Sequence, residues 1–125
     1  MPTDRDIEQF IGDSFSSVWD LELLGAVLSA GDLALTEPQL VERMRSSGLV
    51  VSQGIRTLTV AGIVAVDEDG KVRFAPVNDQ LDDCARRAVA FYRTYPGRTR
   101  RLMIARHSPG LSAFADAFRL RKDEP

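Results

Sequence analysis

Apolar residues near the start of the chain recur at helical spacing and predict two helices. The first covers residues 4–13, and its apolar side chains form one stripe: Ile7, Phe10 and Ile11. The second covers residues 18–28 and begins where Ser16 or Ser17 provides a helix cap. This second helix is apolar on most sides, so we expect it to be central and largely buried, with Trp19 in the core.

A capped helix and a short break follow. Thr36 and Gln39 form the pattern of a capping box, which predicts the start of a helix. Pro38 lies in the first turn, where its missing N–H costs no hydrogen bond, and the helix is expected over residues 37–46. The Ser-Ser-Gly sequence at 46–48 then interrupts the helical pattern.

The next helix is predicted over residues 49–61. Its apolar positions step by four and three: Val51, Ile55 and Leu58. Gly62 closes the helix in the position that favours a left-handed backbone. Gly54, inside the helix, costs up to about 1 kcal/mol of helix propensity. This glycine therefore indicates either close packing at that position or a weakly specified helix.

The period of the apolar residues changes after this helix. Residues 63–66 form a short β-prone run, and Asp69-Gly70 is a strong signal for a turn. A second strand is predicted at 72–75, where Val72 and Phe74 alternate with a polar residue. The chain is thus expected to form one β-hairpin, and the tip of that hairpin carries three acids: Asp67, Glu68 and Asp69.

The last third of the chain reads as helices. A helix over residues 79–95 has one apolar stripe, formed by Leu81, Ala85, Ala88 and Tyr92. Pro96-Gly97 is expected to end it, and residues 98–106 are ambiguous between a short helix and an extended piece. Ser108 is expected to cap a final helix, whose apolar face comprises Leu111, Phe114, Ala115 and Phe118.

This order of elements is that of a winged helix. The stretch Leu21–Ala75 resembles the winged helix-turn-helix of MarR- and ArsR-like bacterial regulators, over about 55 of the 125 residues. The resemblance rests on four segments: Leu35–Leu40, Ser47–Leu58, Ala61–Val64 and Asp67–Lys71. It implies a DNA-binding fold, although winged helices also serve as protein-interaction modules.

The expected fold class is therefore mainly α with one small β-hairpin, in a single domain over residues 1–125. A winged helix-turn-helix core is predicted over 18–77. A C-terminal helical extension over 78–125 is a candidate for dimerisation, because a small winged helix usually binds a two-fold site as a homodimer.

Composition excludes several classes of site. One cysteine and one histidine among 125 residues allow neither an internal disulfide nor a Cys/His zinc site, so no metal and no cofactor are expected. We find no catalytic triad, no paired catalytic carboxylates and no phosphate-binding glycine loop, so we expect no enzyme and no catalytic residues. With no signal peptide and no apolar span, the expected location is cytoplasmic, without membrane contact.

The charge is divided unevenly along the chain. Residues 84–125 contain ten Lys/Arg and three Asp/Glu, whereas residues 1–83 contain six Lys/Arg and fifteen Asp/Glu. This asymmetry has two interpretations: an anionic partner binds the basic part, or the two parts attract each other within the fold.

The resemblance implies double-stranded DNA as the partner and selects candidate contacts. If the apolar positions of the helix over 49–61 face the core, its outer surface presents the base-contacting candidates Ser52, Gln53, Arg56 and Thr57. Gln53 suits adenine and Arg56 suits guanine. Four further cations are candidates for phosphate contacts: Arg43, Arg45, Lys71 and Arg73. The three acids at the hairpin tip count against DNA, because phosphate contacts supply most non-specific affinity.

Two alternatives remain open. The first is a protein-interaction module that binds an acidic protein partner instead of DNA, through Arg93, Arg98, Arg100 and Arg101 among the aromatic residues Phe91, Tyr92 and Tyr95. Otherwise these arginines are solvated and the aromatic residues belong to the core. The second alternative is a sensor that uses Cys84 beside Arg86 and Arg87, as opposed to a buried structural cysteine.

Overall fold

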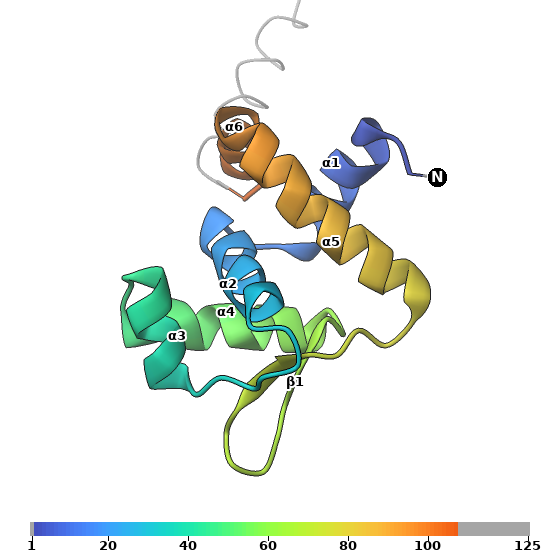
Figure 1. Ribbon diagram of the computed structural model, residues 1–125. Coiled ribbons are helices and arrows are strands. Elements are labelled where there is room, and N and C mark those ends of the chain that lie inside the picture. Colours follow the sequence, from blue (N-terminus) through green and yellow to red (C-terminus); the bar gives the residue numbers. More distant parts are fainter. Residues whose placement is uncertain (1, 108–125) are drawn as a thin grey trace, which may run out of the picture.

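The computed structural model describes residues 2–107 and shows a mainly helical protein with one small antiparallel hairpin (Figure 1). Over these residues, the elements follow in the order α1 (Asp4–Ser14), α2 (Val18–Ser29), α3 (Glu37–Met44), α4 (Gly48–Val60), β1 (Val64–Val66), β2 (Val72–Phe74), α5 (Asp79–Thr94) and α6 (Pro96–His107). The expected coarse fold class, mainly α with one hairpin, is therefore confirmed. The final helix expected from Ser108 lies outside the described residues.

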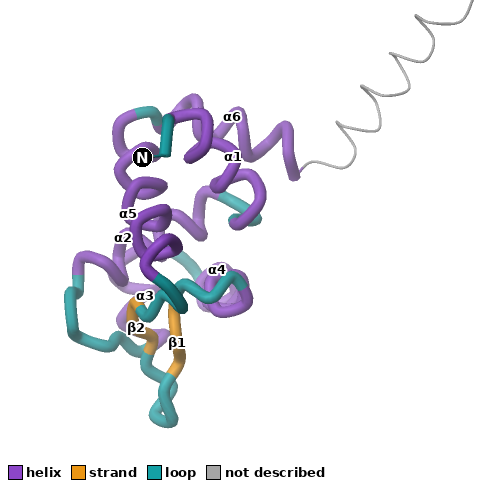
Figure 2. Tube along the Cα trace, turned by 90° about the vertical axis from the view of Figure 1, so that its right-hand side faces the viewer, coloured by secondary structure: helices purple, strands orange, loops and turns teal. Residues whose placement is uncertain are grey.

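Helix α2 lies at the centre of the molecule. It contacts α3, α4, α5 and α6, and Leu21, Leu23, Leu24 and Val27 are buried on it. Helices α1 and α6 pack against each other and against α5. Both views place α1 and α6 at the end of the molecule opposite the hairpin (Figures 1 and 2).

Three helices begin with a capping box, in which a side chain at each end of the first turn accepts a backbone N–H. The box predicted for α3 is present: Thr36 Oγ1 accepts from the Gln39 N–H, and Gln39 Oε1 accepts from the Thr36 N–H. For α2, the cap is Ser17, with Asp20 completing the box. The boxes fix where α2 and α3 start, so the placement of both helices follows directly from local sequence.

The hairpin is short and joins a third segment of chain. Val64 pairs with Phe74 and Val66 with Val72, and Leu35 forms an isolated antiparallel bridge with Val72. Gly70, at the tip, has a φ of 76°, which favours glycine. The bridge joins the segment before α3 to β2. Helices α3 and α4 therefore lie in the stretch of chain between the two bridged residues, Leu35 and Val72.

The expectation that Trp19 belongs to the core is wrong, because 44% of its surface is exposed. Trp19 lies on the same helical stripe of α2 as two exposed polar residues, Glu22 and Ser29. The buried positions of α2 lie on its other faces. A helix that is apolar on most sides still has one solvent-facing stripe, and the first turn of that stripe carries the tryptophan.

Two expected helix boundaries also differ. Helix α5 ends at Thr94, just before Pro96 as expected, but Pro96 also begins α6, which settles the ambiguity over residues 98–106 in favour of a helix. Proline is well suited to this first position because its missing N–H would be unpaired there. Helix α3 ends at Met44, earlier than the expected 46, because Arg45 adopts a left-handed backbone with φ 52°.

None of the helices within residues 2–107 is long and apolar enough to cross a membrane.

Candidate nucleic-acid interface

Helix α4 packs against α2 at Gly54, where α4 carries no side chain and the α2 side chains of Leu23 and Asp20 fill the contact. A Cβ added at Gly54 would lie 2.8 Å from Leu23 Cδ2 and 3.3 Å from Asp20 Oδ1. Gly54 is therefore explained by close packing, the first of the two interpretations of this glycine. Val51 and Leu58, on the same side of α4, are fully buried, so the helix has a defined inner face.

The base-contacting candidates on the outer face of α4 differ in how far they are exposed to solvent. Gln53 and Arg56 are exposed, and Ser52 and Thr57 are half-buried. The Thr57 hydroxyl donates to the Gln53 backbone carbonyl, 3.1 Å away, so this hydroxyl is already engaged within the helix. The side chains free to contact a ligand are therefore chiefly those of Gln53 and Arg56.

Three of these candidates border a hollow of about 440 Å³ between α4 and the start of α2, which we call the α4 hollow. Its lining comprises Ser16, Ser17, Trp19, Asp20, Val50, Gln53, Arg56 and Thr57. Asp20 is buried here, and its Oδ2 accepts from the Ser16 N–H at 2.7 Å and the Ser17 N–H at 3.2 Å. The carboxylate thus fixes the wall of the hollow that faces Arg56.

The α2 residues of this hollow are absent from the sequence-based site. The pattern Ser17-x-x-Asp20 is a capping box by type, and it would have placed Asp20 at the start of α2. That Trp19 and Asp20 face α4 depends on the crossing of two helices, which no local pattern encodes.

On the hairpin, the cations lie at the start of β2 and along it, and the acids lie in the turn between the strands. Lys71 and Arg73 are exposed at the start of β2 and along it. Asp67 Oδ1 accepts from the Asp69 and Lys71 N–H groups, both at 2.9 Å, so this acid shapes the turn. The other two tip acids, Glu68 and Asp69, are exposed. One of the three acids that count against DNA therefore has a structural role.

The structure separates the remaining candidates for phosphate contacts. Arg43 lines a different hollow, of about 280 Å³, between α2, α3 and α5, where Arg93 is also found. Arg45 is exposed just after α3, at the left-handed residue. Arg43 is exposed and lines a different hollow from the one that Gln53 and Arg56 line.

The arginines proposed for a protein partner do not form one patch. Arg98 pairs with Glu8 of α1 and stacks 5.5 Å from the Phe91 ring and 5.7 Å from the Tyr95 ring. Arg93 lies across α2, with Nη2 3.4 Å from the position of a Cβ on Gly25.

The two other members of that set lie on α6. Arg100 and Arg101 are both exposed. Arg101 folds back over the start of its own helix, with Nη1 3.6 Å from a Cβ at Gly97. The four arginines therefore point toward separate neighbours.

Four ion pairs within residues 2–107 join the basic last third to the acidic first two-thirds. Arg98 pairs with Glu8 and Arg106 with Asp13, which connects α6 to α1. On α5, two pairs span one helical turn: Arg86–Asp82 and Arg87–Asp83. For these arginines, the charge asymmetry is explained by attraction within the fold.

The aromatic residues of α5 divide between core and surface. Phe91 and Tyr92 are buried and Tyr95 is 42% exposed. The Tyr92 hydroxyl donates to Glu22 Oε1 at 2.7 Å and so connects α5 to α2. Burial, together with this hydrogen bond, raises the pKa of Tyr92 above the ordinary tyrosine value.

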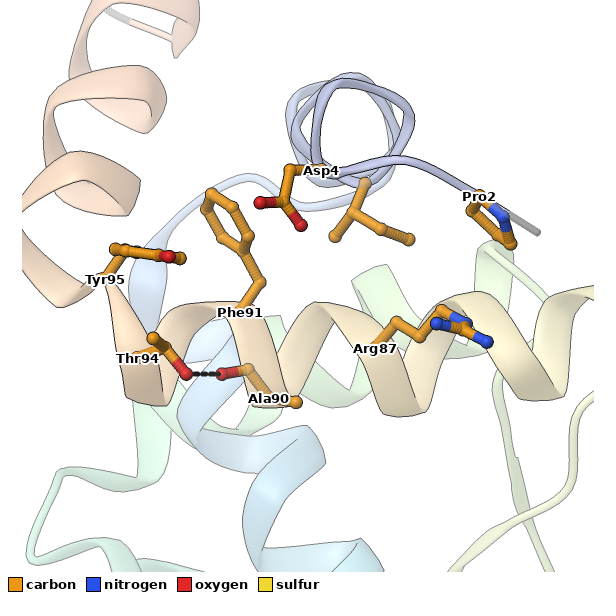
Figure 3. Close-up of a pocket in the computed structure, with 8 residues that line it drawn as sticks. Pro2, Asp4, Arg87, Ala90, Phe91, Thr94 and Tyr95 are labelled. Carbon is orange, nitrogen blue, oxygen red and sulfur yellow. Dashed lines mark hydrogen bonds between the residues drawn. The ribbon is translucent and has the colours of Figure 1, made fainter.

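A further hollow, of about 310 Å³, lies between α1 and α5 (Figure 3). Figure 3 shows Asp4 of α1 facing Phe91, and the Thr94 hydroxyl donating to the Ala90 carbonyl at 2.9 Å. The lining has one carboxylate, Asp4, and one guanidinium, Arg87, and is otherwise apolar or hydroxyl-bearing.

Cys84 is half-buried beside a neighbouring hollow that Phe10 and Asp13 also line. Among the described residues, no group of three or more His, Cys, Asp or Glu side chains is placed to hold a metal ion.

Comparison of the chain with protein-family models, curated proteins and solved structures gives no match.

Proposed function

We propose that this chain is a DNA-binding transcriptional regulator that uses a winged helix-turn-helix and acts as a homodimer. The observation that carries the proposal is the position of α4. This helix is held against α2 at Gly54, exposes Gln53 and Arg56, and leads directly into a two-stranded hairpin. In this proposal α4 is the recognition helix and the hairpin is the wing.

The closure of the hairpin onto the link before α3 supports the same assignment. The Leu35–Val72 bridge has two backbone hydrogen bonds, 2.9 and 2.7 Å long, which hold the proposed wing beside the helix pair α3–α4. Gln53 and Arg56 are three residues apart and so lie on one side of α4. Such a pair suits adenine and guanine edges in the major groove, while Lys71 and Arg73 suit the adjacent phosphates.

The first experiment measures binding of the full-length protein to a labelled random duplex of about 30 base pairs while the salt concentration is varied. The proposal predicts binding at low salt that weakens linearly in log[salt], with a slope that counts the phosphates contacted. No binding at the lowest salt concentration contradicts it.

A second experiment tests the role of α4 on a duplex selected from a random library. We expect Arg56→Ala to cost about 1–3 kcal/mol of specific affinity if its contact with guanine is bidentate. The control is Arg5→Ala, which removes an exposed arginine on α1, at the end of the molecule opposite the hairpin (Figure 1). If both variants discriminate target from random duplex as the wild type does, Arg56 is not a base-contacting residue.

The exposed acids Glu68 and Asp69 favour one second candidate, a winged-helix interaction module that does not bind DNA. It predicts no salt-dependent duplex binding, and a protein partner whose binding depends on Arg98, Arg100 and Arg101, the three exposed α6 cations of its set. The duplex titration separates the two candidates.

A further inference from the structure

Trp19 is the one tryptophan of the chain, and a second hollow borders it on the side away from α4. This Trp19 hollow has a volume of about 310 Å³ and lies between the start of α2 and α6. Its lining comprises Ser16, Ser17, Val18, Trp19, Arg100, Met103 and Ile104.

The walls of the Trp19 hollow present large apolar side chains to solvent. Trp19 of α2 is 44% exposed and Ile104 of α6 is 55% exposed, and both line the hollow. Met103, which also lines it, is buried. Exposed apolar side chains that are grouped together are typical of surfaces that bind another apolar surface.

The residues that follow the described part of α6 are the candidate occupant of the Trp19 hollow. The described part of α6 extends to His107, about one helical turn after Ile104, and residues 108–125 follow in the sequence. Their sequence carries Leu111, Phe114 and Phe118 at helical spacing, which predicts a helix with one apolar face. An apolar face of this kind begins four residues after the end of α6, beside an apolar hollow that α6 itself lines.

We propose that residues 111–120 dock as a helix into the Trp19 hollow of their own chain, with Leu111, Phe114 and Phe118 against Trp19 and Ile104. Ser108-Pro109-Gly110 has the composition of a reverse turn.

The lengths agree with this placement. Three linking residues span up to about 10 Å, which is the separation of packed helices. Ten helical residues measure about 15 Å, the distance from His107 back to Arg98 along α6. A helix that returns antiparallel beside α6 therefore reaches the whole Trp19 hollow.

The test measures acrylamide quenching and emission wavelength of Trp19 in the full-length protein. Because this is the one tryptophan, its fluorescence reports the hollow directly. We expect slow quenching in the wild type. In Phe114→Asp/Phe118→Asp, emission shifts to longer wavelength and the quenching constant rises by about twofold or more, because a large aromatic residue regains solvent.

The matched control is Ala113→Asp/Ala117→Asp, which adds the same charge at the same spacing on the other side of the predicted helix. It is expected to quench as the wild type does. Circular dichroism of all three proteins checks that the fold is retained. Equal quenching of the wild type and the Phe variant overturns the proposal, as does an equal rise in both variants.

Dilution distinguishes this chain from a second copy as the occupant. If the segment docks within its own chain, the quenching constant of the wild type stays the same over about a hundredfold dilution. Protection of Trp19 that is lost on dilution shows that a second copy covers the hollow, and that result overturns docking within one chain.

Discussion

At the scale of single residues, Gly54 sets how closely α4 approaches α2. We expect Gly54→Ala to destabilise the protein by about 1–3 kcal/mol, because the added Cβ would lie 2.8 Å from Cδ2 of Leu23, which is fully buried and would have to shift. The better helix propensity of alanine, worth about 1 kcal/mol, offsets part of this cost. Urea denaturation followed by circular dichroism measures the difference.

Gly48→Ala is the control for that experiment. It lies in the first turn of the same helix, and an added Cβ would meet no atom within 4 Å. We expect this variant to be as stable as the wild type or slightly more stable. Equal losses at positions 48 and 54 would show that helix propensity, not the contact with α2, explains the glycine in the middle of α4.

Tyr92 gives the protein a pH dependence in the alkaline range. Its pKa is raised above 10.0 by burial and by the bond to Glu22, so the folded state keeps the hydroxyl proton longer than the unfolded state does. Its contribution to stability is therefore fully present below about pH 10 and is lost as the pH rises through the folded pKa.

The variant Tyr92→Phe tests this linkage. We expect it to be about 1 kcal/mol less stable at pH 7, because it lacks the 2.7 Å hydrogen bond between α5 and α2. Its deficit should shrink as the pH rises above 10, because it has no hydroxyl to titrate. Tyr95→Phe, at an exposed position, serves as the reference. A deficit that is constant with pH contradicts the assigned cause.

At the scale of elements, α6 is attached to the molecule by apolar burial and by ion pairs, and the magnitudes show which dominates. Met103 is buried, so Met103→Ala should cost about 2–4 kcal/mol. Asp13→Asn removes the partner of Arg106 in a pair whose side chains are both about half exposed, and should cost less than about 1 kcal/mol. Chemical denaturation of both variants compares the two contributions. A larger loss in Asp13→Asn would mean that charge holds α6 in place.

The elements also show where local sequence is sufficient. The start of α3 follows from Thr36, Pro38 and Gln39, because a capping box acts within one turn. The hairpin follows from Gly70 and the alternation around it. The start of α6 was left open because Pro96 both follows the end of α5 and suits the first turn of a new helix, so the proline alone does not decide between the two.

At the scale of the molecule, local sequence does not predict which residues of different helices lie together. Gln53 and Arg56 were predicted from helical periodicity, and both are exposed on α4. Arg43 borders a separate hollow with Arg93 of α5, and its contact with phosphate stays a prediction. The α4 hollow includes Trp19 and Asp20 of α2. Contacts between helices depend on crossing geometry, which side-chain periodicity alone does not determine.

The net charge of the molecule affects its affinity for a polyanion such as DNA. The exposed acids at the hairpin tip act against that affinity. Glu68 is exposed at the tip and accepts no hydrogen bond among those found in residues 2–107, so Glu68→Lys leaves the turn unchanged. If the hairpin is the wing, the new cation gains one phosphate. Binding to a random duplex should then tighten, and the slope against log[salt] should steepen by about 0.9.

Asp4→Lys changes the net charge by the same amount at the opposite end of the molecule, on α1 (Figure 1). It raises the general attraction to DNA, which acts at long range and is screened by salt, but it adds no phosphate contact. The slope of this control should therefore stay at the wild-type value. Equal slopes for the two variants would place the hairpin tip away from the duplex, and the role of the wing would then fall to Lys71 and Arg73 on β2 or to no residue of the hairpin.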